Sequence, residues 1–154
     1  MISFIEMYKR CSIRDPISFK KKSFVAKGGS VKVITKDYLR KKSVVHPYES
    51  NPGYSARINT FFYSNDEKMI AGYWKAPQGW FDVEIGKQSE INYVIEGEIE
   101  LLCGGKKITA KKGDCFLVES GEKLKWIVKK PIKTIFFIYP ANEEIVEFFK
   151  GLEK

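Results

Sequence analysis

The stretch EINYVIEGEIEL, Glu90–Leu101, decides the fold of this chain, together with KKGDCFLVESG at Lys111–Gly121. In the first stretch, apolar residues precede a Glu96-Gly97 step, and polar and apolar residues then alternate again. Gly97 can supply the positive φ of a tight turn, so the stretch predicts two strands joined as a hairpin. In the second stretch, Gly113 introduces the next strand in the same way.

Short segments with strand-like patterns fill most of the chain after about residue 54. Turns that carry Gly, Pro, Asn or Asp separate most of them, which is typical of an all-β sandwich or barrel. The expected strands are Ser55–Tyr63, Lys68–Lys75, Gly79–Ile85, Glu90–Glu96, Glu98–Cys103, Lys106–Thr109, Asp114–Val118, Leu124–Val128 and Lys133–Tyr139. The last segment, ANEEIVEFFKGLEK (Ala141–Lys154), has early acids and an apolar stripe. It predicts a closing helix.

Composition limits the class of protein. A chain of 154 residues fits one domain with a real core. It contains no run of about 18 apolar residues, so we expect no transmembrane helix, and its start lacks a signal-peptide pattern. Cys11, Cys103 and Cys115 share no CxxC spacing, which argues against a disulfide framework or a zinc ribbon. We expect Cys103 and Cys115 to be buried thiols and the protein to be cytoplasmic.

The formal net charge of +8 is concentrated near the N-terminus, where residues 1–46 carry twelve Lys or Arg and three acids. A basic segment can bind nucleic acid, but lysine without an Arg-rich or aromatic-interleaved patch favours a solvated surface. We therefore expect no nucleic-acid partner. We divide the chain into an N-terminal arm, residues 1–50, and a barrel, residues 51–154. Within the arm, Ser30–Thr35 alternates like an edge strand and His46–Tyr54 has the composition of a turn.

Further residues fit a known pattern around the two opening stretches. They are Gly72-Tyr73-Trp74, Gly79-Trp80-Phe81, Gly113-Asp114-Cys115-Phe116, Trp126 and Pro131. Over about residues 70–140 the chain resembles the cupin superfamily (RmlC-like), and within it the subgroup of the ethanolamine-utilization cupin and the ureidoglycine aminohydrolases. The resemblance implies a double-stranded β-helix, the cupin jelly-roll barrel, here with an N-terminal arm and a short C-terminal helix. It also implies a homodimer in which N-terminal segments pack across the partner.

The chain departs from the resemblance at the positions where a metal cupin carries histidines. Those positions are Glu84 and Gly86, or Val83 and Ile85 with the alternative spacing, and Leu124 in the second motif. Imidazole is the common ligand for transition metals, so we expect no histidine-ligated metal and no cofactor. A divalent ion held by oxygen ligands is an alternative that we do not favour.

Glu90 is the acid that survives from the implied metal site. If the alignment holds, Glu84 and Glu90 both point inward, and repulsion between them raises one pKa into the range of a general acid or base. We therefore assign Glu90 and Glu84 as candidate catalytic residues. The candidate ligand-binding residues, a polar neighbour and aromatic side chains for stacking, are Asn92, Trp74, Trp126 and Tyr73. We interpret His46, which lies outside both motifs, as a loop residue.

Two functions follow from these residues. The first is binding of a small metabolite in the barrel without a histidine-ligated transition metal, as an accessory or sensor protein of a metabolic pathway. The alternative is a metal-independent enzyme, similar to an isomerase or epimerase or of the ethanolamine-utilization type, that uses Glu90 for proton transfer. The sequence leaves open whether the protein is an enzyme, because this fold carries many functions.

Overall fold

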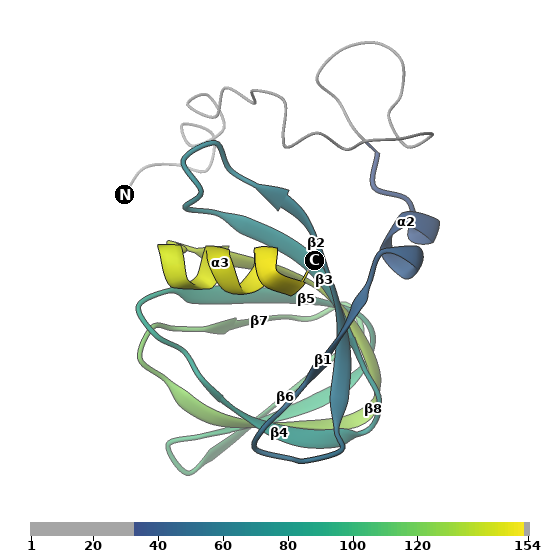
Figure 1. Cartoon of the computed structure of the whole chain (residues 1–154). Coiled ribbons are helices and arrows are strands. Elements are labelled where there is room, and N and C mark those ends of the chain that lie inside the picture. The colour runs from purple at the N-terminus through teal and green to yellow at the C-terminus, as the bar shows by residue number, and fades with distance from the viewer. Residues whose placement is uncertain (1–32, 153–154) are drawn as a thin grey trace.

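The computed structural model describes residues 33–152, which form a barrel of antiparallel strands with two helices (Figure 1). The prediction of a mostly β fold that ends in a helix is confirmed. The elements in chain order are α2 (Lys36–Lys41), β1 (Val44–Pro47), β2 (Ser55–Tyr63), β3 (Ile70–Ala76), β4 (Gly79–Glu84), β5 (Ser89–Cys103), β6 (Lys106–Lys111), β7 (Cys115–Val118), β8 (Lys123–Tyr139) and α3 (Glu143–Leu152).

The two longest strands, β5 and β8, hold the barrel together. The sheet runs in the order β1-β2-β3-β8-β5-β6, with β4 added on β8 and β7 added on β5. The first part of β5 pairs with the last part of β8, from Ser89 opposite Tyr139, and the last part of β5 pairs with the start of β8, to Cys103 opposite Leu124. Each long strand therefore belongs to both halves of the barrel.

The expected hairpin turn at Glu96-Gly97 is wrong. Gly97 has a φ of 94°, as the motif predicts, but it lies inside β5, at a place where the register with β8 shifts. A Cβ atom at Gly97 would lie 2.3 Å from the Pro131 carbonyl oxygen. The glycine thus lets two strands approach closely at a bulge, and the strand bends there without ending. In the same way, the separately expected Leu124–Val128 and Lys133–Tyr139 are parts of the single strand β8.

The N-terminal part of the chain lies mostly outside the described residues, including the start of the expected edge strand Ser30–Thr35. Residues 33–35 are not a strand, and Thr35 instead caps α2 by accepting a hydrogen bond from the Tyr38 amide at 3.2 Å. Strand β1 falls within the segment expected to be the arm, yet it pairs with β2, from Val44 opposite Ile58 to Pro47 opposite Ser55. The barrel sheet therefore begins before residue 51.

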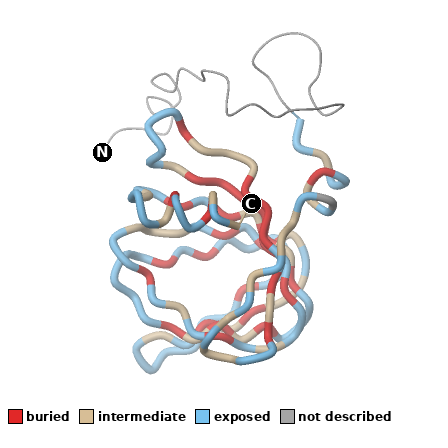
Figure 2. Tube along the Cα trace, in the orientation of Figure 1, coloured by how far each residue is buried: buried red, intermediate tan, exposed pale blue. Residues whose placement is uncertain are grey.

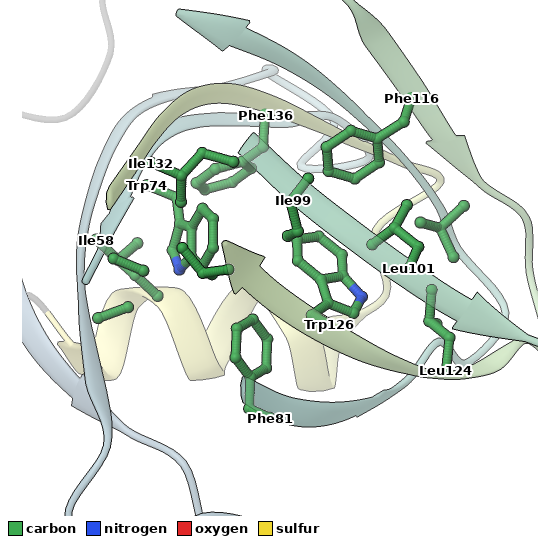
Figure 3. Close-up of a cluster of buried hydrophobic side chains, with 14 of the residues drawn as sticks. Ile58, Trp74, Phe81, Ile99, Leu101, Phe116, Leu124, Trp126, Ile132 and Phe136 are labelled. Atoms are coloured by element: carbon green, nitrogen blue, oxygen red, sulfur yellow. The ribbon is translucent and has the colours of Figure 1, made fainter. Parts of the chain in front are cut away.

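Buried side chains lie along the strands, whereas the turns are exposed (Figure 2). Aromatic and branched residues from β3, β4, β5 and β8 fill the interior (Figure 3). Helix α3 adds to this core through Val146 and Phe149, and the Phe149 ring stacks on Phe136 with centroids 5.6 Å apart. The helix is therefore attached to the barrel by its apolar face.

One expectation about the cysteines is wrong. Cys115 is exposed and Cys103 is half-buried. Both occupy strands in which side chains alternate between the inside and the outside, so an apolar neighbourhood in the sequence does not imply burial. The Cys103 thiol donates a hydrogen bond to Glu122 Oε2 at 2.8 Å.

Candidate functional site

A cavity of about 530 Å³ lies inside the barrel, with walls from β1, β2, β3, β4, β5, β8 and α3. Most of its surface is apolar or aromatic, and the deeper wall includes Ile58, Trp74, Phe81, Ile85, Trp126 and Phe136. Polar side chains reach the same space at a few places, chiefly Glu90 and Asn92 of β5 and Gln88 just before it. An apolar hollow with a small number of convergent polar groups is the usual form of a small-molecule site.

A buried chain of hydrogen bonds fixes the polar wall. Thr134 Oγ1 of β8 donates to Asn92 Oδ1 at 3.0 Å, and Asn92 Nδ2 donates to Glu90 Oε1 at 2.8 Å. Asn92 is 1% exposed and Thr134 is fully buried. Because an ionised carboxylate only accepts hydrogen bonds, the amide nitrogen faces Glu90, and the amide oxygen is left for the Thr134 hydroxyl. The strands thus position one carboxyl group at the cavity wall through two neutral side chains.

The carboxyl of Glu90 lies in surroundings that disfavour its charge. Burial raises the pKa of Glu90 above its usual value, and the hydrogen bond from Asn92 opposes part of this increase. The residue as a whole is half-buried, as expected for a side chain in the wall of an open cavity. No lysine or arginine partner of Glu90 occurs among residues 33–152. The site therefore holds an acid without a counter-charge.

Aromatic rings line the same cavity as this carboxyl, and Figure 3 shows Trp74, Phe81 and Trp126 gathered in one cluster. Trp74 and Trp126 meet edge to face with centroids 5.6 Å apart, and Phe81 lies 5.5 Å from Trp126. Tyr48 stacks on Phe81 at 3.9 Å and accepts a hydrogen bond from Trp74 Nε1 at 3.0 Å. Trp74 and Trp126 are thus both in the cavity wall, as expected. Within the part of the chain that the structure describes, Trp126 Nε1 has no hydrogen-bond partner, and it points toward Leu124 in Figure 3.

His46 is a cavity residue that the sequence reasoning missed. It lies in β1, lines the cavity, and packs edge to face against Tyr48 at 4.8 Å and Phe148 at 5.2 Å. Burial lowers the pKa of His46, so its imidazole is neutral at pH 7. The adjoining Pro47 suggested a loop, and only the pairing of β1 with β2, which is not local in sequence, brings the ring to the cavity.

Glu84, expected to point inward beside Glu90, points outward. Along β4 the residues Phe81, Val83 and Ile85 alternate with the exposed Asp82 and Glu84. Glu84 Oε1 lies 3.0 Å from Lys123 Nζ, and Asp82 Oδ1 lies 3.6 Å from Lys125 Nζ, so both acids belong to ion pairs at the outer rim. The repulsion expected between Glu84 and Glu90 is therefore not the cause of the raised pKa.

Tyr73, expected to bind ligand, also lies on the other side of the sheet. It is buried in β3 between Trp74 and Gly72, where alternation directs it away from the Trp74 side. It is not part of the cavity wall. Asn59, its partner in β2, donates to the Tyr38 carbonyl of α2 at 3.4 Å, so this face packs toward α2.

The donor set does not fit the metal site of a metal cupin. The inward positions are Val83 in β4 and Ile85 directly after it, which matches the alternative spacing, and Leu124 is buried in the core. None of these can ligate a metal. Among the described residues no group of three or more His, Cys, Asp or Glu side chains could hold a metal ion.

In the same part of the chain no helix has the length and apolar character needed to cross a membrane.

Comparison with known proteins shows which family this chain resembles. The model of a family described as "Ethanolamine utilisation protein EutQ" matches residues 6–144. The chain is 26% identical over 82 residues to a protein of Clostridioides difficile (strain 630) named "Acetate kinase EutQ", which covers 53% of this chain and 52% of that protein. The chain thus spans about half the length of the curated relative that it matches.

Solved structures agree on the fold. The EutQ protein of Clostridium difficile superposes with a TM-score of 0.54 at 26% identity, over 60% of this chain and 73% of that chain. A putative ethanolamine utilization protein Q of Salmonella typhimurium LT2 superposes with a TM-score of 0.63 at 21% identity, over 78% of this chain and 96% of that chain. At such identity the second likeness concerns the fold alone.

Proposed function

Because this chain belongs to the family "Ethanolamine utilisation protein EutQ", within the cupin superfamily, we propose that it binds a small metabolite in its barrel cavity without a histidine-ligated transition metal. It would act as an accessory or sensor protein of ethanolamine utilisation. The observation that carries this proposal is the buried chain Thr134–Asn92–Glu90, which ends at the wall of an apolar cavity of about 530 Å³. A barrel that served packing alone would have no need of a fixed, desolvated carboxyl in an open hollow.

The name of the Clostridioides difficile relative raises acetate kinase activity as another possibility for this chain. Phosphoryl transfer requires cationic groups or metal ions that hold the phosphates. Among the described residues that line the cavity there is no Lys or Arg, and its polar wall is an acid. We therefore do not propose phosphoryl transfer in this cavity.

Cargo that copurifies with the protein tests metabolite binding directly. We expect native mass spectrometry of protein taken rapidly from cells to show an added mass that denaturation releases. Val83→Trp would fill the cavity from β4, because Val83 is a half-buried, inward-facing wall residue, and the variant should lose the added mass. The matched control is Val45→Trp on the exposed face of β1, which should keep it. Absence of any cargo in the wild type, with no metabolite stabilising the protein, would refute the proposal.

A second candidate function is proton transfer by Glu90 in a metal-independent, isomerase-like enzyme. The observation that favours it is a pair of titratable groups on one cavity whose charged forms are both disfavoured, Glu90 with a raised pKa and His46 with a lowered pKa. Such pairs are suited to general acid and base work near neutral pH. With a substrate in hand, Glu90→Gln should lower kcat by at least about a hundredfold. Unchanged turnover would exclude this function.

The homodimer and the cytoplasmic location remain predictions. Support for a dimer comes from an uncharged patch on the outer face of the sheet, the outer patch, formed by Ile91, Tyr93, Cys115, Leu117, Phe137 and Tyr139. Leu117 and Phe137 flank Ile91 on the neighbouring strands β7 and β8, so the patch is continuous. Each copy of the chain has a net charge of +8, but the outer patch itself carries no charge. Two copies can therefore meet through their outer patches without repulsion between like charges at the contact.

A further inference from the structure

We infer that the ligand of this cavity is a small primary organic ammonium, held by Glu90 as its counter-ion. This inference rests on the proposed function, because it names the chemical class of the metabolite bound there. Three observations support it: the charge of the cavity wall, the unpaired acceptors in that wall, and the aromatic rings that line the same cavity.

The charge of the wall is opposite to that of the chain. The chain has a formal net charge of +8, yet the described lining residues include Asp82, Glu84, Glu90 and Glu144 and no Lys or Arg. Asp82 and Glu84 are compensated by Lys125 and Lys123 at the outer rim. Glu144 is exposed in α3, whereas Glu90 is half-buried in the cavity wall. A cavity that took carboxylates or phosphates would be expected to show the reverse pattern.

Two acceptors near the start of β5 lack the donors that a buried position requires. Glu90 receives one hydrogen bond, from the neutral Asn92 amide, whereas an ionised carboxylate can accept several. Gln88 Oε1, two residues earlier and also in the lining, is buried without any hydrogen-bond partner among residues 33–152. An ammonium group carries three N–H donors and one positive charge. It would satisfy both oxygens and supply the missing counter-charge in one step.

The aromatic side of the cavity suits the remainder of such a ligand. Trp74, Phe81 and Trp126 present ring faces and edges within one cluster, and Tyr48 closes it against Phe81. Ring faces attract a cation and shield the carbon skeleton attached to it. An alcohol of the same shape would gain the apolar contacts but would leave Glu90 uncompensated. An anion would in addition be repelled by the ionised Glu90 carboxylate.

Matched probes test the charge requirement by isothermal titration calorimetry. Butylamine against 1-butanol, and ethanolamine against ethylene glycol, differ only in an ammonium replaced by a hydroxyl, and glycolate supplies an anion. We expect each amine to bind at least about tenfold more tightly than its alcohol, and glycolate not to bind. Glu90→Gln keeps the shape and the acceptor for Asn92 but removes the charge, and should abolish the preference for the amine. Glu84→Gln, which removes an ion-paired acid at the outer rim, should preserve it.

The outcomes separate this inference from the proposed function. Equal binding of amine and alcohol, tighter binding of glycolate, or loss of the preference in Glu84→Gln but not in Glu90→Gln would overturn the ammonium assignment. So would failure of both amines to bind at concentrations up to about 10 mM. The cargo experiment decides about metabolite binding independently, because a copurified neutral or anionic molecule would uphold the cavity and refute the ammonium.

Discussion

Replacement of Thr134 by valine should destabilise the protein far more than its small chemical change suggests. Valine has nearly the shape of threonine and suits a strand, so packing at this fully buried position of β8 is retained. The change removes the hydroxyl that donates to Asn92 Oδ1 at 3.0 Å, and Asn92 is itself 1% exposed, so water cannot replace the donor. An unsatisfied buried carbonyl oxygen costs about 1–3 kcal/mol, and we expect a loss of that size.

Urea unfolding followed by tryptophan fluorescence measures this loss. The midpoint should fall while the slope stays unchanged, because the same surface is exposed on unfolding. In a thermal scan, each 1 kcal/mol should lower Tm by about 2–4 °C. The matched control is Thr109→Val on the exposed face of β6, where solvent satisfies the hydroxyl. That variant should stay within about 0.5 kcal/mol of the wild type.

The reasoning would be refuted by equal effects at the two threonines. Such a result would mean that Asn92 finds another donor, or that the chain of hydrogen bonds does not persist in solution. A more specific consequence follows at the site. Without the hydroxyl the Asn92 amide keeps only one of the two hydrogen bonds that fix it, so Glu90 is held less firmly and the variant should also bind cargo more weakly.

Three further predictions concern Glu90, Gly97 and the outer patch. Burial raises the pKa of Glu90 above its unfolded value of 4.5, so the folded chain binds more protons and the wild type loses stability as pH rises from about 4.5 through the folded pKa. Glu90→Gln has no carboxyl to ionise and escapes this loss, so its free energy of unfolding should exceed that of the wild type by an amount that grows with pH over that window. If urea titrations gave a difference between the two proteins that did not change with pH, burial of Glu90 would not be the cause. Gly97→Ala should cost at least about 2 kcal/mol, because alanine is strained at this φ and its Cβ would collide with the Pro131 carbonyl, and an unchanged urea midpoint would argue against the bulge. Ile91→Glu at the centre of the outer patch should convert a dimer to a monomer in light scattering after size exclusion, and a dimer that persists would place the interface elsewhere.

The sequence predicted the strands well where turn residues and alternation act locally. It predicted their connections less well, because a glycine with positive φ serves equally in a hairpin turn and in a bulge. The motif predicts a hairpin turn at Gly97, but the structure has a bulge there. The choice depends on Pro131, which lies against Gly97 in space although it is distant in the chain. No local pattern contains that contact.

The candidate site was predicted in part. Glu90, Asn92, Trp74 and Trp126 line one cavity, as expected. The prediction that Glu84 points inward is wrong because it places the strand out of register by one residue. A shift of one residue moves every side chain of a strand to the opposite face. The alternation of Phe81, Val83 and Ile85 with acids was visible in the sequence and would have given the correct face.

Other members of the site carried no local signal. Thr134 is one of four threonines in the chain, all in strand-like patterns, and only the register of β5 with β8 brings it to Asn92. Gln88 and His46 owe their place in the wall to the barrel as a whole. Their roles depend on contacts between elements, which composition and spacing do not encode.

The position of β8 has a consequence for how the protein is made. Strands β3, β4 and β5 all pair with β8, which ends at Tyr139, close to the end of the described chain. A nascent chain on the ribosome therefore lacks the common partner of three strands until β8 has been synthesised. Until then those strands expose unpaired edges, which makes the growing chain a candidate for chaperone binding and for aggregation when synthesis stalls. Premature truncation before Tyr139 should yield insoluble protein and not a smaller barrel.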